Sequence, residues 1–257
     1  MSHTRKDGRA LRIVERPARH VVAALRRKWD TIRCDLLQMH ALSPPLANVI
    51  VKEGDGRDLQ DIGLRDESID IVFTSPPYPN NIDYSEVYKL ELWLLGFIES
   101  SEQFLQLRKS TLRSHPSSDL AKGPNAEFMQ AIGTSPLKRW VDPMISRTAS
   151  FTQRWQTTLV LSYFSDLWTS LKEQFRCLKE GGRAFLVVAN SLHGNSGNAY
   201  LIPTDLLVGQ LGNALGFELE RILVARNTRR RLSGNHFLRE SVVVLRKPYG
   251  KSKRAAL

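Results

Sequence analysis

Residues 71–78 read Ile-Val-Phe-Thr-Ser-Pro-Pro-Tyr, an apolar and β-branched run that stops at two consecutive prolines. Proline fixes φ and lacks a backbone N–H, so a strand cannot continue through Pro76 and Pro77, and the turn that follows is rigid. In open α/β sheets, ligands bind just beyond the carboxyl ends of the strands. The turn offers the hydroxyl of Ser75, backbone carbonyls and the aromatic face of Tyr78. Together these groups can hold a flat ring that carries an amine.

Upstream of this turn, residues 49–59 read Val-Ile-Val-Lys-Glu-Gly-Asp-Gly-Arg-Asp-Leu, which predicts a further strand followed by a Gly-Asp-Gly turn. The order of strand, Gly-Asp turn, strand and Ser-Pro-Pro-Tyr resembles the DNA methyltransferases that methylate an exocyclic amine with S-adenosylmethionine. The resemblance covers about residues 48–98 and 157–247, and Leu-Arg-Glu-Ser at 238–241 also matches. The Ser-Pro-Pro-Tyr form is the one most associated with cytosine N4, with adenine N6 as the second possibility.

The resemblance implies a role for each residue of the turn. Ser75 and the carbonyl after it would accept hydrogen bonds from the target amine, Tyr78 would stack on the base, and Pro76 and Pro77 would keep the turn rigid. Because the target atom lies within the duplex stack, the base would have to flip out.

The same resemblance implies that Asp55, Gly56 and Thr74 contact the cofactor, S-adenosylmethionine. Asp55 has an equally good interpretation as an ordinary turn residue. Asp83 and Tyr84 could line the base pocket, or Asp83 could instead cap the helix that begins near Ser85.

One part of the family pattern is missing from this chain. Members carry an Asp-Pro-Phe-x-Gly-Ser-Gly-like loop, whose glycines let the backbone approach the cofactor. No such segment occurs here, there is no glycine between Gly8 and Gly54, and only ten residues follow Lys247. Either a second polypeptide supplies the loop, as in a split enzyme, or the chain is a DNA-binding subunit without activity. A substitute loop at 193–198 is a distant third explanation.

The remaining segments predict an α/β fold. Strands alternate with helices, which indicates a mostly parallel, Rossmann-like sheet of the class I methyltransferase type, incomplete at the half that carries the cofactor loop. The last two strands are joined by a loop and predict an antiparallel pair. We expect a basic arm and helix at 1–47 and a catalytic domain at 48–257, with a helical insertion at 100–155. The expected strands are 70–73, 183–190, 217–224 and 240–246, and the expected helices are 18–42, 86–97, 156–178 and 202–215.

The chain is strongly basic, with a net charge of +11 and a pI near 9.9. Residues 221–257 hold eleven Lys or Arg against a single acidic residue. This excess favours a polyanionic partner, DNA, over a merely solvated basic surface. The candidate phosphate contacts are Arg226, Arg229, Arg230 and Arg231.

Cysteine content and hydropathy favour a cytoplasmic protein. The only cysteines, Cys34 and Cys177, have neither a disulfide pattern nor the spacing of metal ligands. No apolar run approaches the ~20 residues of a membrane span, and residues 1–20 lack the apolar core of a signal peptide. We therefore expect no metal and no membrane partner.

Overall fold

The computed structural model describes residues 3–7, 10–14, 20–42, 47–79, 82–134, 136–149, 155–193, 200–229 and 237–250. The chain divides into two compact units, Met1–Glu53 and Gly54–Leu257, which are described separately below. The division lies close to the expected boundary at residue 47.

The first unit contains a hairpin and one long helix. Strands β1 (His3–Asp7) and β2 (Ala10–Val14) pair antiparallel, with Arg5 opposite Arg12. The basic arm expected at the start of the chain is therefore a hairpin, in which Asp7 pairs with Ala10. Helix α1 (Val21–Ala41) confirms the helix expected at 18–42, and none of its residues is buried.

Residues 49–51 do not form the expected strand. Val49, Ile50 and Val51 are 83%, 80% and 90% exposed, and none of them pairs with another strand within the described ranges. A strand needs a neighbour to satisfy its backbone groups, so β-branched composition alone does not create one. The turn that follows does form, with the amide of Asp58 bonded to the carbonyl of Asp55 at 2.9 Å.

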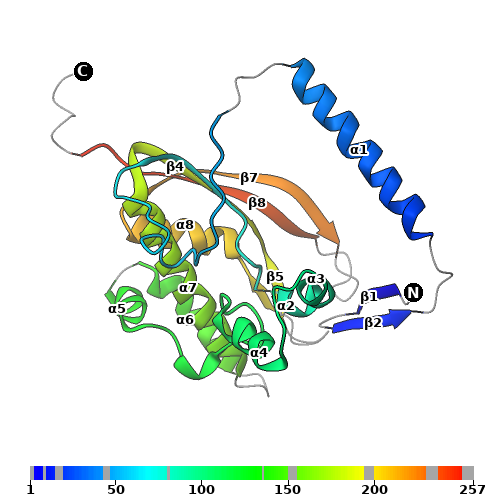
Figure 1. Ribbon diagram of the computed structural model, residues 1–257. Coiled ribbons are helices and arrows are strands. Elements are labelled where there is room, and N and C mark those ends of the chain that lie inside the picture. The colour runs from blue at the N-terminus through cyan, green and yellow to red at the C-terminus, as the bar shows by residue number, and fades with distance from the viewer. Residues whose placement is uncertain are drawn as a thin grey trace. The chain divides into compact units, whose positions relative to one another are not determined.

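The second unit is built on a four-stranded sheet of order β3-β4-β8-β7. Strand β3 (Ile69–Thr74) pairs parallel with β4 (Leu178–Ala189), whereas β8 (Phe237–Arg246) pairs antiparallel with both β4 and β7 (Glu218–Arg229). Three of these strands therefore point the same way, and β8 is reversed between β4 and β7 (Figure 1). The α/β fold and the antiparallel final pair are confirmed, but the sheet is mixed rather than mostly parallel, because only β3 and β4 pair parallel and both pairings of β8 are antiparallel. A separate small sheet joins β5 (Ser191–His193) to β6 (Tyr200–Ile202).

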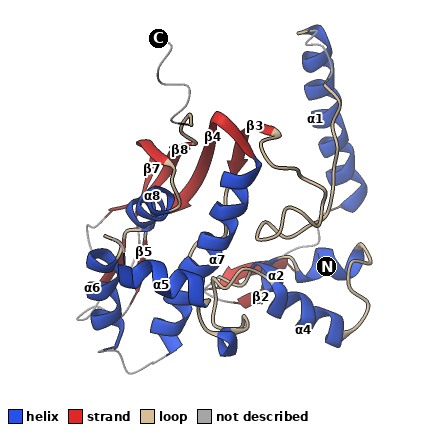
Figure 2. Cartoon of the chain, turned by 90° about the vertical axis from the view of Figure 1, so that its left-hand side faces the viewer, coloured by secondary structure: helices blue, strands red, loops and turns tan. Residues whose placement is uncertain are grey.

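Helices pack on one face of this sheet (Figures 1 and 2). The two long ones, α7 (Trp155–Cys177) and α8 (Thr204–Ala214), confirm the helices predicted at 156–178 and 202–215. The single helix expected at 86–97 is divided into α2 (Tyr84–Val87) and α3 (Lys89–Leu94). The insertion is helical, as expected, and contains α4 (Ser101–Ser110), the 3-10 turn η1 (Leu120–Lys122), α5 (Ala126–Thr134) and α6 (Lys138–Ala149).

The hydrophobic core lies between one face of the sheet and helices α7 and α8. Leu186 of β4 and Leu245 of β8 are at most 1% exposed, and they belong to the same cluster as Leu167 of α7 and Leu211 of α8. Helix α8 approaches the sheet so closely that a Cβ on Gly212 would lie 2.7 Å from Leu245 Cδ1. Glycine is therefore required there for packing.

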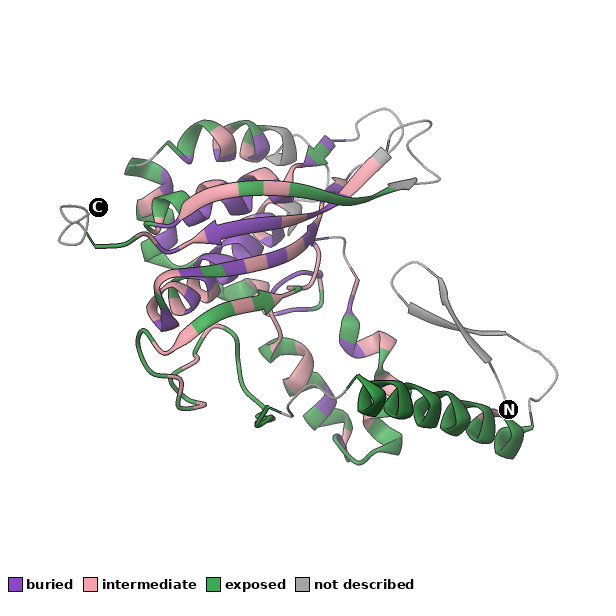
Figure 3. Cartoon of the chain, turned by 90° about the horizontal axis from the view of Figure 1, so that it is seen from above, coloured by how far each residue is buried: buried purple, intermediate pink, exposed green. Residues whose placement is uncertain are grey.

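The opposite face of the sheet is much less covered (Figure 3). We call it the open face. In β3, Ile71 is 62% and Phe73 is 72% exposed. The ring of Phe73 stacks on the half-buried Phe185 of β4, with 6.2 Å between the ring centroids. The open face consists of Ile71, Phe73, Phe185, Val187, Leu223 and Val242.

Along the chain as described, no helix combines the length and apolarity needed to cross a membrane.

Candidate active site

The turn at 75–78 begins directly at the carboxyl end of β3. Thr74, the last residue of the strand, lies opposite Leu186 of β4, so the turn projects from the edge where ligands are expected. Ser75 is exposed, and its Oγ donates a hydrogen bond to the carbonyl of Val187 at 3.4 Å. The Ser75 hydroxyl also interacts with Tyr78, where it opposes the rise in the pKa of the phenol.

Side chains from distant segments hold the far end of the turn in place. The buried ring of His193 contacts the carbonyl of Pro79 through Nε2 at 2.5 Å. His193 belongs to β5, so the small β5–β6 sheet supports the turn from one side. The rigidity expected from two prolines is thus reinforced by tertiary contact.

The turn forms one wall of a cavity of about 440 Å³. This volume lies within the range of small-molecule sites, ~300–1,000 Å³. The cavity brings together all four residues of the predicted catalytic turn with side chains from α2, the segment after α4, β7 and β8. Its lining residues are Ser75, Pro76, Pro77, Tyr78, Tyr84, Ser85, Thr111, Leu112, Ser114, His115, Arg226 and Glu240.

A carboxylate of β8 fixes the aromatic ring in this cavity. The hydroxyl of Tyr78 donates a hydrogen bond to Glu240 Oε1, and Arg226 Nε donates one to Oε2 of the same carboxylate. Burial, followed by the hydrogen bond to Glu240, raises the pKa of Tyr78 to about 12. The hydrogen bond from Tyr78 lowers the pKa of Glu240, burial opposes it, and Arg226 adds to the lowering. At neutral pH the phenol is therefore protonated and the carboxylate ionised.

The neighbours of Glu240 in β8 point to the other side of the sheet. Arg239 Nε and Ser241 Oγ donate hydrogen bonds to Asp205 Oδ2, at 2.6 and 2.8 Å, and Asp205 in α8 is fully buried. Alternation along the strand accounts for this arrangement, since successive side chains face opposite sides. The segment 238–241 therefore connects α8 to the turn at 75–78.

One of the lining residues is a buried histidine, His115, which lies beside the acidic Asp83. Asp83 caps α2 by accepting from the amide of Glu86 at 3.3 Å, which is the capping alternative for this residue, and it also binds Arg108 Nε at 2.5 Å. His115 is 2% exposed, and its Nδ1 lies 3.6 Å from Asp83 Oδ2. Burial lowers the pKa of His115, with Asp83 opposing this effect and Arg108 adding to it. Neutral imidazole is therefore favoured in the folded protein.

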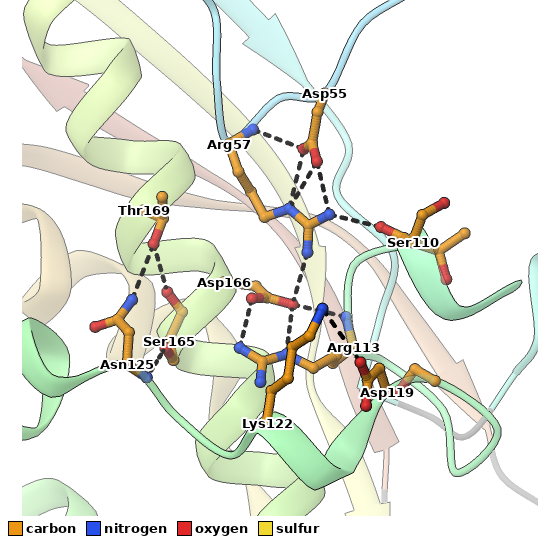
Figure 4. A network of polar contacts seen from close by, with 12 residues as sticks. Asp55, Arg57, Ser110, Arg113, Asp119, Lys122, Asn125, Ser165, Asp166 and Thr169 are labelled. Carbon is orange, nitrogen blue, oxygen red and sulfur yellow. Dashed lines mark hydrogen bonds and ion pairs between the residues drawn. The ribbon is translucent and has the colours of Figure 1, made fainter. Parts of the chain in front are cut away.

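Asp55, a predicted cofactor contact, belongs to a different cavity and is already engaged (Figure 4). Its carboxylate accepts hydrogen bonds from the backbone amide of Arg57 at 2.9 Å and from the guanidinium of the same residue. Arg57 Nη1 also donates a hydrogen bond to Asp166 Oδ2 in α7, at 3.3 Å. Asp166 in turn accepts two hydrogen bonds from Arg113, from Nε at 3.0 Å and from Nη2 at 2.7 Å. This network anchors the 54–58 turn to α7, as the turn-residue interpretation of Asp55 requires.

The other predicted site residues are less constrained. A Cβ on Gly56 would come no closer than 3.7 Å to Ser170 Oγ, which is an ordinary contact, so the surroundings do not require glycine there. The side chain of Arg226 is 68% exposed. Arg229 contributes backbone to the end of β7, whereas its side chain and all of Arg230 and Arg231 lie outside the described residues.

Sequence reasoning missed the residues that complete the cavity. Glu240 lies within the Leu-Arg-Glu-Ser stretch at 238–241, which matches the family pattern. The match drew attention to this stretch but did not indicate what Glu240 does. Thr111 and Ser114 come from the insertion, where no periodicity or motif distinguishes them, whereas His115 is one of the basic residues of the insertion that are a weaker sequence candidate for target recognition. No group of three or more His, Cys, Asp or Glu residues suited to a metal ion occurs among the residues that the structure describes.

Comparison with curated proteins finds relatives that are type II methyltransferases, although no family model matches the chain. The type II methyltransferase M.AvaI of Anabaena variabilis is 29% identical over 196 residues, which is 70% of this chain and 38% of that protein. M.BsoBI of Geobacillus stearothermophilus, also a type II methyltransferase, is 25% identical over 211 residues, or 72% of this chain and 40% of that protein. The chain thus spans about two fifths of the length of these curated relatives.

A solved structure shows a weaker likeness. TTHA0409 of Thermus thermophilus, assigned as a DNA modification methylase, is 15% identical with a TM-score of 0.39, covering 77% of this chain and 53% of that one. For the same protein complexed with S-adenosyl-L-methionine, the identity is 17% and the TM-score 0.38.

Proposed function

We propose that this chain is the base-binding part of a DNA methyltransferase that transfers a methyl group from S-adenosylmethionine to an exocyclic amine, with cytosine N4 as the preferred target. The observation that carries the proposal is the Ser75–Tyr78 turn at the carboxyl end of β3, which forms one wall of a cavity of about 440 Å³. The similarity to type II methyltransferases over about 70% of this chain supports it.

In this proposal the hydroxyl of Ser75 and the carbonyl after it accept hydrogen bonds from the amine of the flipped base. Such an amine is conjugated and weakly nucleophilic, so acceptors that draw it out of conjugation with the ring assist its attack. The oxygen of the Ser75 hydroxyl can accept such a hydrogen bond while its proton is donated to the carbonyl of Val187. Pro76 and Pro77 keep the two acceptors in register.

Tyr78 supplies the stacking platform for the base. Its hydroxyl is bound to Glu240, so the ring is oriented before the base arrives, and little rotational freedom is lost on binding. Arg226, at the mouth of the cavity, and Arg229, Arg230 and Arg231 would bind DNA phosphates. The basic charge of the chain supports DNA as the partner.

The methyl donor, S-adenosylmethionine, provides an electrophilic methyl group when it is bound. Thr74, Asp55 and Gly56 are the residues of this chain proposed to contact it, yet they do not make a complete site. Asp55 is held by Arg57, Gly56 is not enclosed, and the chain has no glycine-rich loop for the methionine part. We therefore assign base binding to this chain and methyl transfer to an assembly with a second polypeptide.

A nucleoside assay tests the proposal. DNA is incubated with the assembly and S-adenosylmethionine, digested to nucleosides and analysed by mass spectrometry. We expect N4-methylcytosine, whereas N6-methyladenine would move the proposal to adenine. The missing loop favours a second candidate, a DNA-binding subunit without activity. DNA binding without any methylated nucleoside would support that candidate instead.

A further inference from the structure

Three polar side chains connect a buried carboxylate to the cavity at the 75–78 turn. His115 Nδ1 lies 3.6 Å from Asp83 Oδ2, and His115 Nε2 lies 3.4 Å from Thr111 Oγ1. Thr111 and His115 both line the cavity, and Asp83 is 4% exposed. The order of carboxylate, imidazole and hydroxyl is one in which a histidine can take up a proton from a bound group.

Asp83 is held as an ionised group. Burial raises its pKa, but hydrogen bonds from Ser85 Oγ and Arg108 Nε, both at 2.5 Å, outweigh burial and lower the pKa overall. A carboxylate beside one ring nitrogen of a histidine favours the hydrogen on that nitrogen. The tautomer expected for His115 therefore carries its hydrogen on Nδ1, and the lone pair of Nε2 faces Thr111.

The fold does not fully engage the imidazole of His115. The side chain is 2% exposed, and within the described ranges Nδ1 makes no hydrogen bond. The charged groups that act on the ring are Asp83 and Arg108, and Arg108 is itself shared between Asp83 and Glu86. A buried polar ring that is incompletely paired costs free energy. A purely structural role for His115 leaves this cost unexplained.

The hydroxyl of Thr111 can connect the imidazole to a bound base. It donates a hydrogen bond to the carbonyl of Arg108 at 2.9 Å, which accounts for its longer contact with Nε2 of His115. Hydroxyl groups rotate, and catalytic hydrogen bonds that are long in a free enzyme often shorten when substrate binds. Rotation towards Nε2 leaves the oxygen of Thr111 free to accept from a group in the cavity.

Methyl transfer to an amine requires such an acceptor. The lone pair of the amine nitrogen attacks the methyl carbon, and the electron pair of the broken carbon–sulfur bond remains on sulfur. The nitrogen is then cationic and must lose one of its two hydrogens. Because this cation is a strong acid, even a histidine whose pKa is lowered by burial can accept its proton. The hydroxyl of Ser75 can orient the amine but cannot keep a proton at neutral pH.

We propose that His115 accepts the proton of the methylated amine, that Thr111 passes it on, and that Asp83 orients the ring. The hydroxyl of Thr111 gives its hydrogen to Nε2 and receives the amine hydrogen in exchange. Thr111 is therefore unchanged, and His115 becomes an imidazolium that Asp83 stabilises. Water that enters the cavity after product release takes the proton away. The inference rests on the proposed function and adds a route for the proton to it.

Nitrogen NMR of the histidine rings tests the starting state in the full chain without any methylation. The variant His115→Gln identifies the signals of His115. At neutral pH we expect an uncharged ring with its hydrogen on Nδ1. A DNA duplex with an unpaired cytosine should shift the Nε2 signal. Hydrogen on Nε2, or an Nε2 signal that the duplex leaves in place, would overturn the inference.

Single-turnover methylation by the assembled enzyme tests the proton transfer itself. His115→Gln should slow methylation about 10²-fold, the lower end of what a positioned proton acceptor contributes. DNA affinity should stay as in the parent. The rate of the parent should fall as the pH drops below 6.5, the ordinary pKa of histidine, because a protonated ring accepts nothing. This acid limb should disappear in His115→Gln, and its persistence would contradict the proposal.

Variants of Thr111 keep the test valid if His115→Gln fails to fold. Thr111→Val should slow methylation about tenfold, since water replaces the hydroxyl only in part, and Thr111→Ser should restore the rate. The exposed Thr134, whose hydroxyl bonds the carbonyl of Gln130, gives the matched control Thr134→Val. Parent rates in both His115→Gln and Thr111→Val would reject the proton route and leave the proposed function intact. A parent assembly that methylates no DNA would reject the proposed function, and the route with it.

Discussion

Tyr78 and Glu240 lie 162 residues apart in the sequence, yet the hydroxyl of the first donates a hydrogen bond to the carboxylate of the second. This contact joins the turn after β3 to the middle strand β8 and determines how the ring faces the cavity. From the sequence alone, the aromatic face of Tyr78 is expected to matter more than its hydroxyl. The structure gives the hydroxyl a task as well.

The phenol should therefore contribute measurably to both stability and base binding. Tyr78→Phe removes one hydrogen bond to an ionised group and should cost about 1–2 kcal/mol in the free energy of unfolding, measured by urea denaturation. Tyr78→Ala also removes the stacking platform. Its binding free energy for DNA that carries an unpaired target base should be weaker by ~1–3 kcal/mol. Tyr88→Phe, at an exposed tyrosine of the same region, is the control. Equal stability of Tyr78→Phe and the parent would mean that the contact with Glu240 contributes nothing.

Ser75→Ala should separate chemistry from binding. The variant loses one oriented acceptor for the amine, which typically costs ~10²–10³ in rate for a preorganised contact. DNA affinity should stay within about twofold, because the hydroxyl contacts only the reacting group. Single-turnover methylation by the assembled enzyme measures the rate, with the exposed Ser101→Ala as control. If Ser75→Ala methylates as fast as the parent, the turn has only a structural role.

The arginines after β7 should govern the salt dependence of DNA binding. Replacing Arg229, Arg230 and Arg231 with Ala should reduce the slope of log affinity against log salt by up to ~3, if each neutralises one phosphate. The triple Lys variant preserves the charge and should keep the slope. Fluorescence anisotropy across a salt series supplies the data. An unchanged slope in the Ala variant would leave these residues as a solvated charged segment.

His115 should make the folded state sensitive to mild acid. Its pKa in the folded protein lies below the ordinary value of 6.5 because of burial. The unfolded chain therefore takes up a proton at a higher pH than the folded chain, and stability falls as the pH drops from 6.5 towards the folded pKa. His115→Gln should flatten this part of the profile of melting temperature against pH, whereas exposed His20→Gln should not. A steeper fall in His115→Gln would contradict the assignment.

The network around Asp166 should stabilise the fold. The side chains of Asp166 and Arg113 are only 7% and 10% exposed, so Asp166→Ala leaves a buried cation without its partner. A loss of about 3–5 kcal/mol is expected in denaturant unfolding. Asp142→Ala breaks an exposed pair with Lys138 and should cost less than about 1 kcal/mol. Similar losses in the two variants would show that the buried pair stabilises the fold no more than the exposed pair does.

Local signals in the sequence predicted the turn at 75–78 and the long helices correctly, because two prolines or a regular apolar spacing act within a few residues. The strand expected at 49–51 failed for the opposite reason, since its formation depends on a neighbour that the pattern cannot reveal. Thr111 and Ser114 could not be predicted, because their positions in the cavity result from the path of the insertion. The role of Glu240 required the register of β8 against β4.

The reversal of β8 changes which end of a strand can take part in the chemistry. In a uniformly parallel sheet, only residues that follow the strands meet at the functional edge. Here Glu240 lies opposite Ala189, near the carboxyl end of β4, although it is close to the beginning of its own strand. An insertion or deletion within β8 ahead of Glu240 would therefore shift Glu240 relative to Tyr78, whereas a change at the far end of β8 would spare both.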